Sequence, residues 1–182
     1  PLLRAGITHL WFITLHPFDD GNGRITRTLT DLALAQMDEQ SIRLYAVSPV
    51  ILNKRKSYYE ILEQTQKNDS NITNWLVWFL DTLNDSLETT LKQINRTLFK
   101  SQFWHKYSNL DINEGQRKVL NRLLDGGENG FEHGISASQY QKVAKVSKAT
   151  ATRHLSDLLE KECIIKLEGG GRNTRYQINT QL

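Results

Sequence analysis

The sequence predicts a mainly α-helical protein in two parts: a partial helical bundle over residues 1–108, and a smaller unit of helices with a two-stranded β-hairpin over residues 109–182. Two observations support this. Apolar residues recur at intervals of three and four along most of the first part, as they do in amphipathic helices. Near the C-terminus, two short apolar runs flank a glycine-rich segment, which is typical of paired strands.

The first two predicted helices flank a proline and a glycine-rich loop. Residues 2–15 are rich in apolar side chains at helical spacing. Pro17 disfavours the helical conformation for His16, so the first helix should end there. Residues 24–37 form the second predicted helix. We expect it to bury a stripe of four apolar residues, Ile25, Leu29, Leu32 and Leu34.

The third predicted helix follows a short connection over residues 40–47. Ser48 and Pro49 are a strong helix start, because serine is a favoured N-cap and proline is favoured in the first turn. The helix should continue to about residue 67, where a polar break over residues 68–71 begins. Its expected apolar positions are Val50, Ile51, Tyr58, Ile61 and Leu62.

A fourth, long helix should be capped by Thr73 and continue to about Tyr107. The residues expected to lie in its core face are Trp75, Trp78, Phe79 and Leu83. Further apolar residues extend this stripe toward the second part, at Leu87, Leu91, Ile94 and Leu98. The aromatic residues near its end are expected at the junction of the two parts, at Phe103, Trp104 and Tyr107.

The second part has the element order of a winged helix-turn-helix. Asn113 should cap a helix over residues 114–124, and Ser136 begins a capping-box pattern for a helix that ends at residue 144. Ser147 should cap a third helix over residues 148–162. Residues 163–167 and 174–178 are the predicted strands of a two-stranded β-wing.

The stretch over residues 16–27, HPFDDGNGRITR, carries most of the chemistry in the sequence. A histidine lies where one helix ends, and two glycines precede the next. Glycine lets a ligand approach the backbone closely, and a helix start attracts phosphate through its free N–H groups and its dipole. Arg24 and Arg27 share a helix face because they are three residues apart. Asp20 suits a magnesium ion that accompanies a nucleotide, since Mg²⁺ is usually held by one or two carboxylates and by phosphates.

This stretch resembles the signature of the Fic family, His-x-Phe-x-Asp/Glu-Gly-Asn-Gly-Arg-x-x-Arg, and matches it at every fixed position. The resemblance implies a Fic-type helical bundle, with His16 as the general base and Phe18 as an apolar anchor for the loop. It implies ATP as substrate, with Mg²⁺ bound by Asp20. The residues implied to bind the phosphates of the nucleotide are Gly21, Asn22, Gly23, Arg24 and Arg27.

The resemblance also implies that the helix over residues 48–67 supplies part of the adenine pocket. Either Tyr58 or Tyr59 could stack on the base, and core packing is the alternative for each of them. Lys54 and Arg55 on the same helix are expected in solvent.

The function we expect from the resemblance is transfer of AMP from Mg·ATP to a Ser, Thr or Tyr hydroxyl of a target protein. Two alternatives stay open. The same site could remove AMP or transfer another phosphate-containing group, or the protein could be a DNA-binding regulator whose Fic part senses nucleotide.

Some features of the family are not found in this sequence. In the family, a β-hairpin flap that aligns the target precedes the signature, and nothing in this sequence can supply it. The family's inhibitory motif, Ser/Thr-x-x-x-Glu-Gly/Asn, is also absent from these residues. The sequence begins at Pro1 inside an expected helix, so we expect a C-terminal piece of a longer protein. We expect this piece to bind nucleotide and to transfer AMP poorly.

An excess of basic residues lies toward the C-terminal end of the sequence and hints at a nucleic-acid partner. If the second part binds DNA, its recognition helix should lie in the major groove. The residues of this helix that should face the groove are Lys148, Thr150, Thr152, Arg153 and His154. The wing should contact phosphate or the minor groove through Arg172 and Arg175. The alternative is a module for protein docking or dimerisation, so a homodimer is also open.

Composition sets the remaining limits. The net charge is +3, and no apolar run approaches the roughly 20 residues of a membrane-spanning helix. No secretory signal is visible. The single cysteine, Cys163, excludes an intrachain disulfide and is expected to be a buried thiol. These observations favour a cytoplasmic protein.

Overall fold

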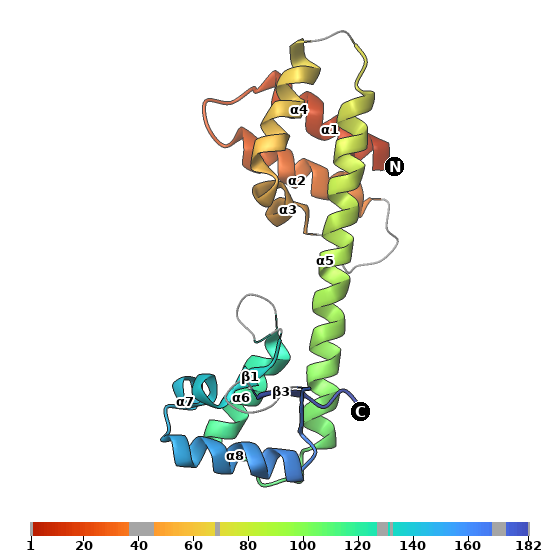
Figure 1. The fold of residues 1–182 in the computed structure, drawn as a ribbon. Helices are drawn as coiled ribbons and strands as arrows, with labels where there is room; N and C mark the ends of the chain where they lie inside the picture. The colour runs from red at the N-terminus through yellow and green to blue at the C-terminus, as the bar shows by residue number, and fades with distance from the viewer. Residues whose placement is uncertain are drawn as a thin grey trace. The chain divides into compact units, whose positions relative to one another are not determined.

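The computed structural model describes residues 2–36, 46–67, 70–126, 131, 133–168 and 174–181. These residues form eight helices and one three-stranded antiparallel sheet, which confirms the predicted mainly α-helical class (Figure 1). The chain divides into two compact units, Pro1–Gln93 and Ile94–Leu182. The predicted domain boundary after residue 108 stays a prediction. No helix among the described residues combines the length and the apolar character that crossing a membrane requires.

The N-terminal unit contains four helices and the first part of a fifth. Their bounds are α1 Leu2–Leu15, α2 Asn22–Ala35, α3 Val47–Asn53, α4 Arg55–Lys67 and α5 Thr73–Lys106. The predicted extent of α1 is confirmed, whereas α2 begins two residues before its predicted start. Residues 37–45 and 68–69, which include parts of both predicted connections, lie outside the described residues.

The helix predicted over residues 48–67 is two helices, with Lys54 between them. Ser48 is not an N-cap, because α3 begins one residue earlier, at Val47. The backbone of Lys54 leaves the helical conformation, and its ammonium group forms an ion pair with Asp85 of α5. Lys54 was expected in solvent, so this tertiary contact is a correction. The expected apolar positions of both helices are buried or half-buried.

The core of the N-terminal unit is built against α5. Trp75 and Phe79 are completely buried, and the Trp75 indole N–H donates a hydrogen bond to the Gly6 carbonyl oxygen at 2.9 Å. A Cβ atom on Gly6 would lie 2.9 Å from the Phe79 ring, so glycine lets α1 approach α5 closely. The buried apolar residues of this core are Ala5, Leu10, Ala33, Leu34, Val47, Ile51, Leu62, Trp75, Phe79 and Leu83.

The buried face of α2 differs from the prediction. Of the four apolar residues expected there, three are half-buried or exposed, namely Ile25, Leu29 and Leu32. The face that is buried is polar and contains Asn22, Thr26 and Thr30. Thr26 and Thr30 each donate their hydroxyl proton to the carbonyl oxygen four residues earlier, at 2.7 and 2.8 Å. The prediction failed because a threonine whose hydroxyl is bonded inside its own helix can be buried like an apolar residue.

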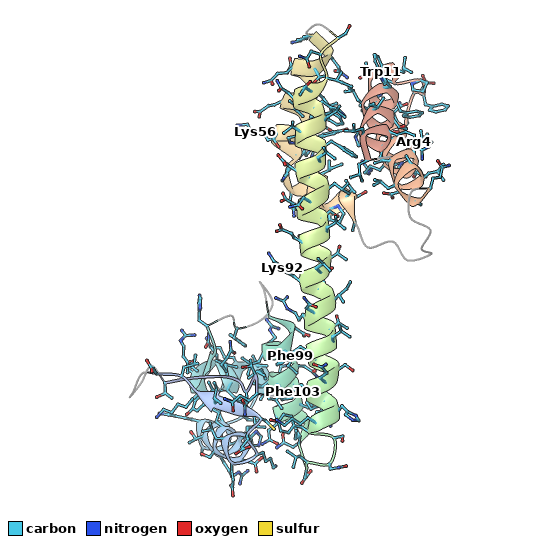
Figure 2. All side chains as sticks on the ribbon, turned by 90° about the vertical axis from the view of Figure 1, so that its right-hand side faces the viewer. Arg4, Trp11, Lys56, Lys92, Phe99 and Phe103 are labelled. Atoms are coloured by element: carbon cyan, nitrogen blue, oxygen red, sulfur yellow. The ribbon has the colours of Figure 1, made fainter. Side chains whose placement is uncertain are left out.

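The apolar stripe predicted to continue along α5 is not part of either core. Leu91 and Leu98 are 53% and 56% exposed, and Ile94 is 36% exposed. The aromatic residues that follow belong to the core of the C-terminal unit and not to a junction. Phe103 and Tyr107 are buried in that core, and Phe99 and Trp104 pack against it. Figure 2 labels Phe99 and Phe103 on α5.

The C-terminal unit continues with three helices, α6 Glu114–Asp125, α7 Ala137–Ala144 and α8 Lys148–Glu160. All three predicted N-caps are confirmed. Asn113 and Ser136 each form a complete capping box with the glutamine three residues later. The Ser147 hydroxyl accepts a hydrogen bond from the Thr150 backbone N–H at 3.2 Å.

The sheet of this unit has three strands, β1 Ile135–Ser136, β2 Ile164–Lys166 and β3 Arg175–Ile178, in the order β1-β3-β2. The predicted pair of strands is confirmed, with Ile164 opposite Ile178. The third strand, β1, was not predicted, because its two residues are too few to show a periodicity. Gly134 precedes β1 at φ +76°, and a Cβ atom there would lie 2.8 Å from the Tyr176 carbonyl oxygen.

The single cysteine lies in the core of the C-terminal unit. Cys163 is completely buried, as predicted, and burial raises the pKa of its thiol to about 11. Because the thiolate is the reactive form, this environment makes the thiol inert.

Candidate active site

His16 lies at the end of α1 in an unusual backbone conformation. Its N–H donates to the Phe12 carbonyl oxygen at 3.1 Å, which closes the last turn, and its φ is +47°. Pro17 disfavours the right-handed helical conformation for His16, and the left-handed region is a common way to end a helix. Histidine is one of the few non-glycine residues enriched there. The exposed imidazole is therefore held on a fixed backbone at the start of the signature loop.

The loop that follows is fastened by Asn22, the first residue of α2. The Asn22 side chain is buried, and its oxygen accepts a hydrogen bond from the Phe18 backbone N–H at 3.1 Å. Its amide group donates in turn to the Phe18 carbonyl oxygen. The backbone of Phe18 is thus the anchor of the loop, while the residue as a whole is 52% exposed. The Asn22 side chain is occupied inside the loop, which leaves its backbone N–H for the predicted phosphate contact.

The signature residues line one cavity of about 270 Å³. Gly21 caps α2 in the left-handed conformation, at φ +85°, where glycine is strongly favoured. The N–H groups of Arg24 and Ile25 donate to the Gly21 carbonyl oxygen, whereas those of Asn22 and Gly23 have no acceptor within the helix. The cavity therefore lies at a helix start that favours anions. The residues that line it are His16, Asp19, Asp20, Gly21, Asn22, Gly23, Arg24 and Arg27.

Asp20 meets the requirements for a magnesium ligand in this cavity. Its carboxylate is almost fully exposed and lies 3.4 Å from the Arg24 guanidinium, an ion pair that is weak at such exposure. The described residues contain no group of three or more His, Cys, Asp or Glu side chains that could hold a metal alone. A single carboxylate beside a phosphate site fits Mg²⁺, which is commonly bound by one or two carboxylates together with substrate phosphates.

A second cavity, of about 480 Å³, shares Arg27 with the first. Its walls come from α3 and α4 and are largely apolar and aromatic. The residues that line it are Arg27, Ser48, Pro49, Ile51, Leu52, Arg55, Tyr58 and Tyr59. Tyr59 is 56% exposed, and the Arg55 guanidinium lies 5.8 Å above its ring, so Arg55 is a cavity residue and not simply solvated.

A comparison with known families identifies the segment that forms the smaller cavity. Residues 1–34 match the model of the Fic/DOC family. These 34 residues are similar to part of a Fic domain. The match covers α1, the signature loop and nearly all of α2, and it therefore includes every residue of the smaller cavity. Apart from Arg27, the residues of the larger cavity lie outside the matched range. They are assigned to the same site only because the larger cavity shares Arg27 with the smaller one.

Sequence reasoning missed one polar residue of this Fic domain. His9 of α1 is buried, and its Nδ1 lies 2.9 Å from the Thr30 Oγ1 while its Nε2 lies 3.0 Å from the Tyr58 hydroxyl. Burial, helped by the charge of Arg27, lowers the pKa of His9 to about 4, so it is neutral at pH 7. Burial also raises the pKa of Tyr58 to about 12. A lone histidine in an apolar helix gave no signal that it would join these two residues.

The residues considered for DNA contact belong to the C-terminal unit, and those that the structure describes lie on α8 and β3. Lys148, Thr152 and Arg153 are exposed on α8, and Thr150 is half-buried at its start. Arg175 donates to the Gly134 carbonyl oxygen at 2.9 Å. Arg172 lies outside the described residues.

His154 does not point outward from α8 as expected. Its Nδ1 lies 3.0 Å from the Tyr140 hydroxyl, and its Nε2 lies 3.4 Å from the Asn113 amide. These contacts join α8 to α7 and to the cap of α6. The His154 side chain therefore makes its hydrogen bonds inside the C-terminal unit. The helical spacing of α8 could not reveal this, because it does not show which neighbours a polar side chain meets.

Proposed function

We propose that this protein transfers AMP from Mg·ATP to a Ser, Thr or Tyr hydroxyl of a target protein. The partial Fic domain supports transfer of a nucleotidyl or other phosphate-containing group in general. The observation that carries the finer proposal is the pair of adjoining cavities. One is lined by a histidine, a glycine loop and two arginines, and the other by apolar and aromatic side chains, with Arg27 in both. This pairing suits a nucleotide whose phosphates lie in the smaller cavity and whose base lies in the larger one.

The chemistry assigns a separate task to each group. His16 accepts the proton of the target hydroxyl while its oxygen attacks the α-phosphorus of ATP. The bond between the α-phosphorus and its bridging oxygen breaks, and pyrophosphate leaves. The N–H groups at the start of α2, together with Arg24 and Arg27, stabilise negative charge on the phosphates. A magnesium ion held by Asp20 supplies further positive charge when it is bound.

Titration with ATP, with and without Mg²⁺, tests this proposal on the parent and on Asp20→Ala. The parent should bind ATP more tightly when Mg²⁺ is present, by about 5–150-fold if the coupling has a typical size. Asp20→Ala should lose this difference. In the absence of metal it should bind ATP at least as tightly as the parent, because a negative charge beside the phosphates has been removed.

Asp19→Ala is the matched control, because Asp19 lines the same cavity and its replacement makes the same change in charge. It should retain most of the Mg²⁺ effect. If Asp20→Ala retains the full Mg²⁺ effect, Asp20 is not the ligand. If the parent does not bind ATP at all, the proposed function itself is wrong.

A second candidate function belongs to the C-terminal unit, which we propose to be a winged helix that binds duplex DNA. The observation that favours it is the set of exposed residues on α8, the second helix of the α7–turn–α8 pair, with the three-stranded sheet after it. Lys148, Thr152 and Arg153 are exposed along this helix and available to the phosphates and bases of a major groove.

Binding to a duplex at several salt concentrations tests this candidate. The affinity of the parent should fall as salt rises, because binding releases counterions from the phosphates. Arg153→Ala should weaken binding and lower the salt slope by about one if Arg153 contacts a phosphate. Arg122→Ala removes the same charge from the exposed end of α6 and should change binding less. A parent that binds no duplex even at low salt would exclude the function.

A further inference from the structure

We propose that His9 is a positioning residue, which holds the Tyr58 ring in place as a wall of the larger cavity by accepting a hydrogen bond from the Tyr58 hydroxyl. This inference rests on the proposed function, because it takes the larger cavity to be the site of the nucleotide base. His9 does not line either cavity and is almost completely buried, so it acts through Tyr58 and not through contact with the ligand.

The hydrogen bonds around His9 fix where its proton lies. A threonine hydroxyl has one proton to donate, and that of Thr30 goes to the Thr26 carbonyl oxygen at 2.8 Å. The Thr30 oxygen must therefore accept from His9, so the proton of the imidazole is on Nδ1. Since buried His9 is neutral, its Nε2 carries no proton and accepts from the Tyr58 hydroxyl at 3.0 Å. The bonds thus run in one direction, from Tyr58 through His9 to α2.

The rings around this pair restrict its movement. The His9 ring packs against the rings of Trp75 and Phe79, with centroid distances of 5.4 and 6.0 Å. The Tyr58 ring in turn meets Trp78 at 5.6 Å and Tyr59 at 5.3 Å. The hydroxyl of Tyr58 is thus fixed by His9 and its ring by aromatic neighbours. Together these contacts keep one face of the larger cavity in a single arrangement before any ligand binds, which lowers the cost of binding.

The same polar face of α2 supports both cavities. At one end Asn22 fastens the loop of the smaller cavity, and Thr26 donates to the Asn22 carbonyl oxygen at 2.7 Å. At the other end Thr30 orients His9, which orients Tyr58. The buried polar residues of α2 therefore link the loop of the smaller cavity to the wall of the larger one.

Two variants of His9 separate its bond to Tyr58 from its bond to Thr30. In His9→Asn the amide lies near the position of Nδ1, so it can still bond to Thr30 but is too short for Tyr58. In His9→Gln the amide reaches the position of Nε2 and can accept from the Tyr58 hydroxyl. Both replace a neutral imidazole by a neutral amide, so the two are a matched pair.

The measurement is the dissociation constant of each variant for ATP and for inorganic triphosphate, which has the phosphates but no base. His9→Asn should weaken ATP binding by about 2–12-fold, the value of one neutral hydrogen bond of roughly 0.5–1.5 kcal/mol. It should leave triphosphate binding unchanged, because the smaller cavity is intact. His9→Gln should bind both ligands like the parent.

The outcomes distinguish the inference from the function on which it rests. A parent that binds no ATP contradicts the proposed function. A parent that binds ATP while His9→Asn, still folded by circular dichroism, binds it equally well contradicts the positioning role. Equal weakening for ATP and triphosphate also contradicts it, since this indicates general damage. If His9→Asn does not fold, Tyr58→Phe replaces it, and unchanged ATP binding by that variant overturns the inference.

Discussion

Replacement of His16 by asparagine is expected to slow AMP transfer by about 10²–10⁴-fold, the usual contribution of a general base, with little change in ATP affinity. Asparagine cannot take the hydroxyl proton, but it tolerates the left-handed backbone conformation that His16 adopts at φ +47°. The variant therefore removes the base without disturbing the end of α1. The measurement is labelling of target protein with tagged ATP, together with ATP titration.

His16→Ala separates the role of the imidazole from that of the backbone. Alanine also lacks the base, but it is strained at a positive φ by roughly 1–2 kcal/mol. Equal losses of labelling in the alanine and asparagine variants support the assignment of His16 as the base. Labelling by His16→Asn at the rate of the parent would refute it. The mass gained or lost by the target shows whether AMP or another phosphate-containing group is transferred.

The parts of the structure that were predictable from the sequence are those that depend on local chemistry. The end of α1 before Pro17 and the three caps at Asn113, Ser136 and Ser147 follow from backbone conformation and from hydrogen bonds within a few residues. The smaller cavity was predictable for the same reason, because all of its residues lie within one stretch of twelve, residues 16–27.

The parts that were not predictable depend on tertiary contacts. The break at Lys54 accompanies an ion pair with Asp85, thirty-one residues further along the chain. His154 is directed by Tyr140 and Asn113, which lie on other elements. His9 was missed because its partners come from α2 and α4, and no spacing within α1 indicates them. Polar residues of this kind are placed by neighbours that periodicity does not reveal.

Arg27 is the residue whose loss should weaken nucleotide binding most, because it is the one signature residue that lines both cavities in the described part of the chain. Arg27→Ala should raise the dissociation constant for ATP by about 10–100-fold, since a hydrogen bond to a charged group contributes roughly 1.5–3 kcal/mol. The loss for AMP should be much smaller if Arg27 holds the outer phosphates. Isothermal titration with both nucleotides measures the two losses.

Two further variants determine which property of Arg27 matters. Arg27→Lys retains the positive charge but not the planar fork that binds two phosphate oxygens at once, so it should recover only part of the affinity. Arg4→Ala removes the same charge from α1 at a position that lines neither cavity, and it should bind ATP like the parent. Equal losses for AMP and ATP in Arg27→Ala would place the main contact of Arg27 in the larger cavity. Such a result would tie Arg27 to the wall of the larger cavity, which it also lines, rather than to the phosphates.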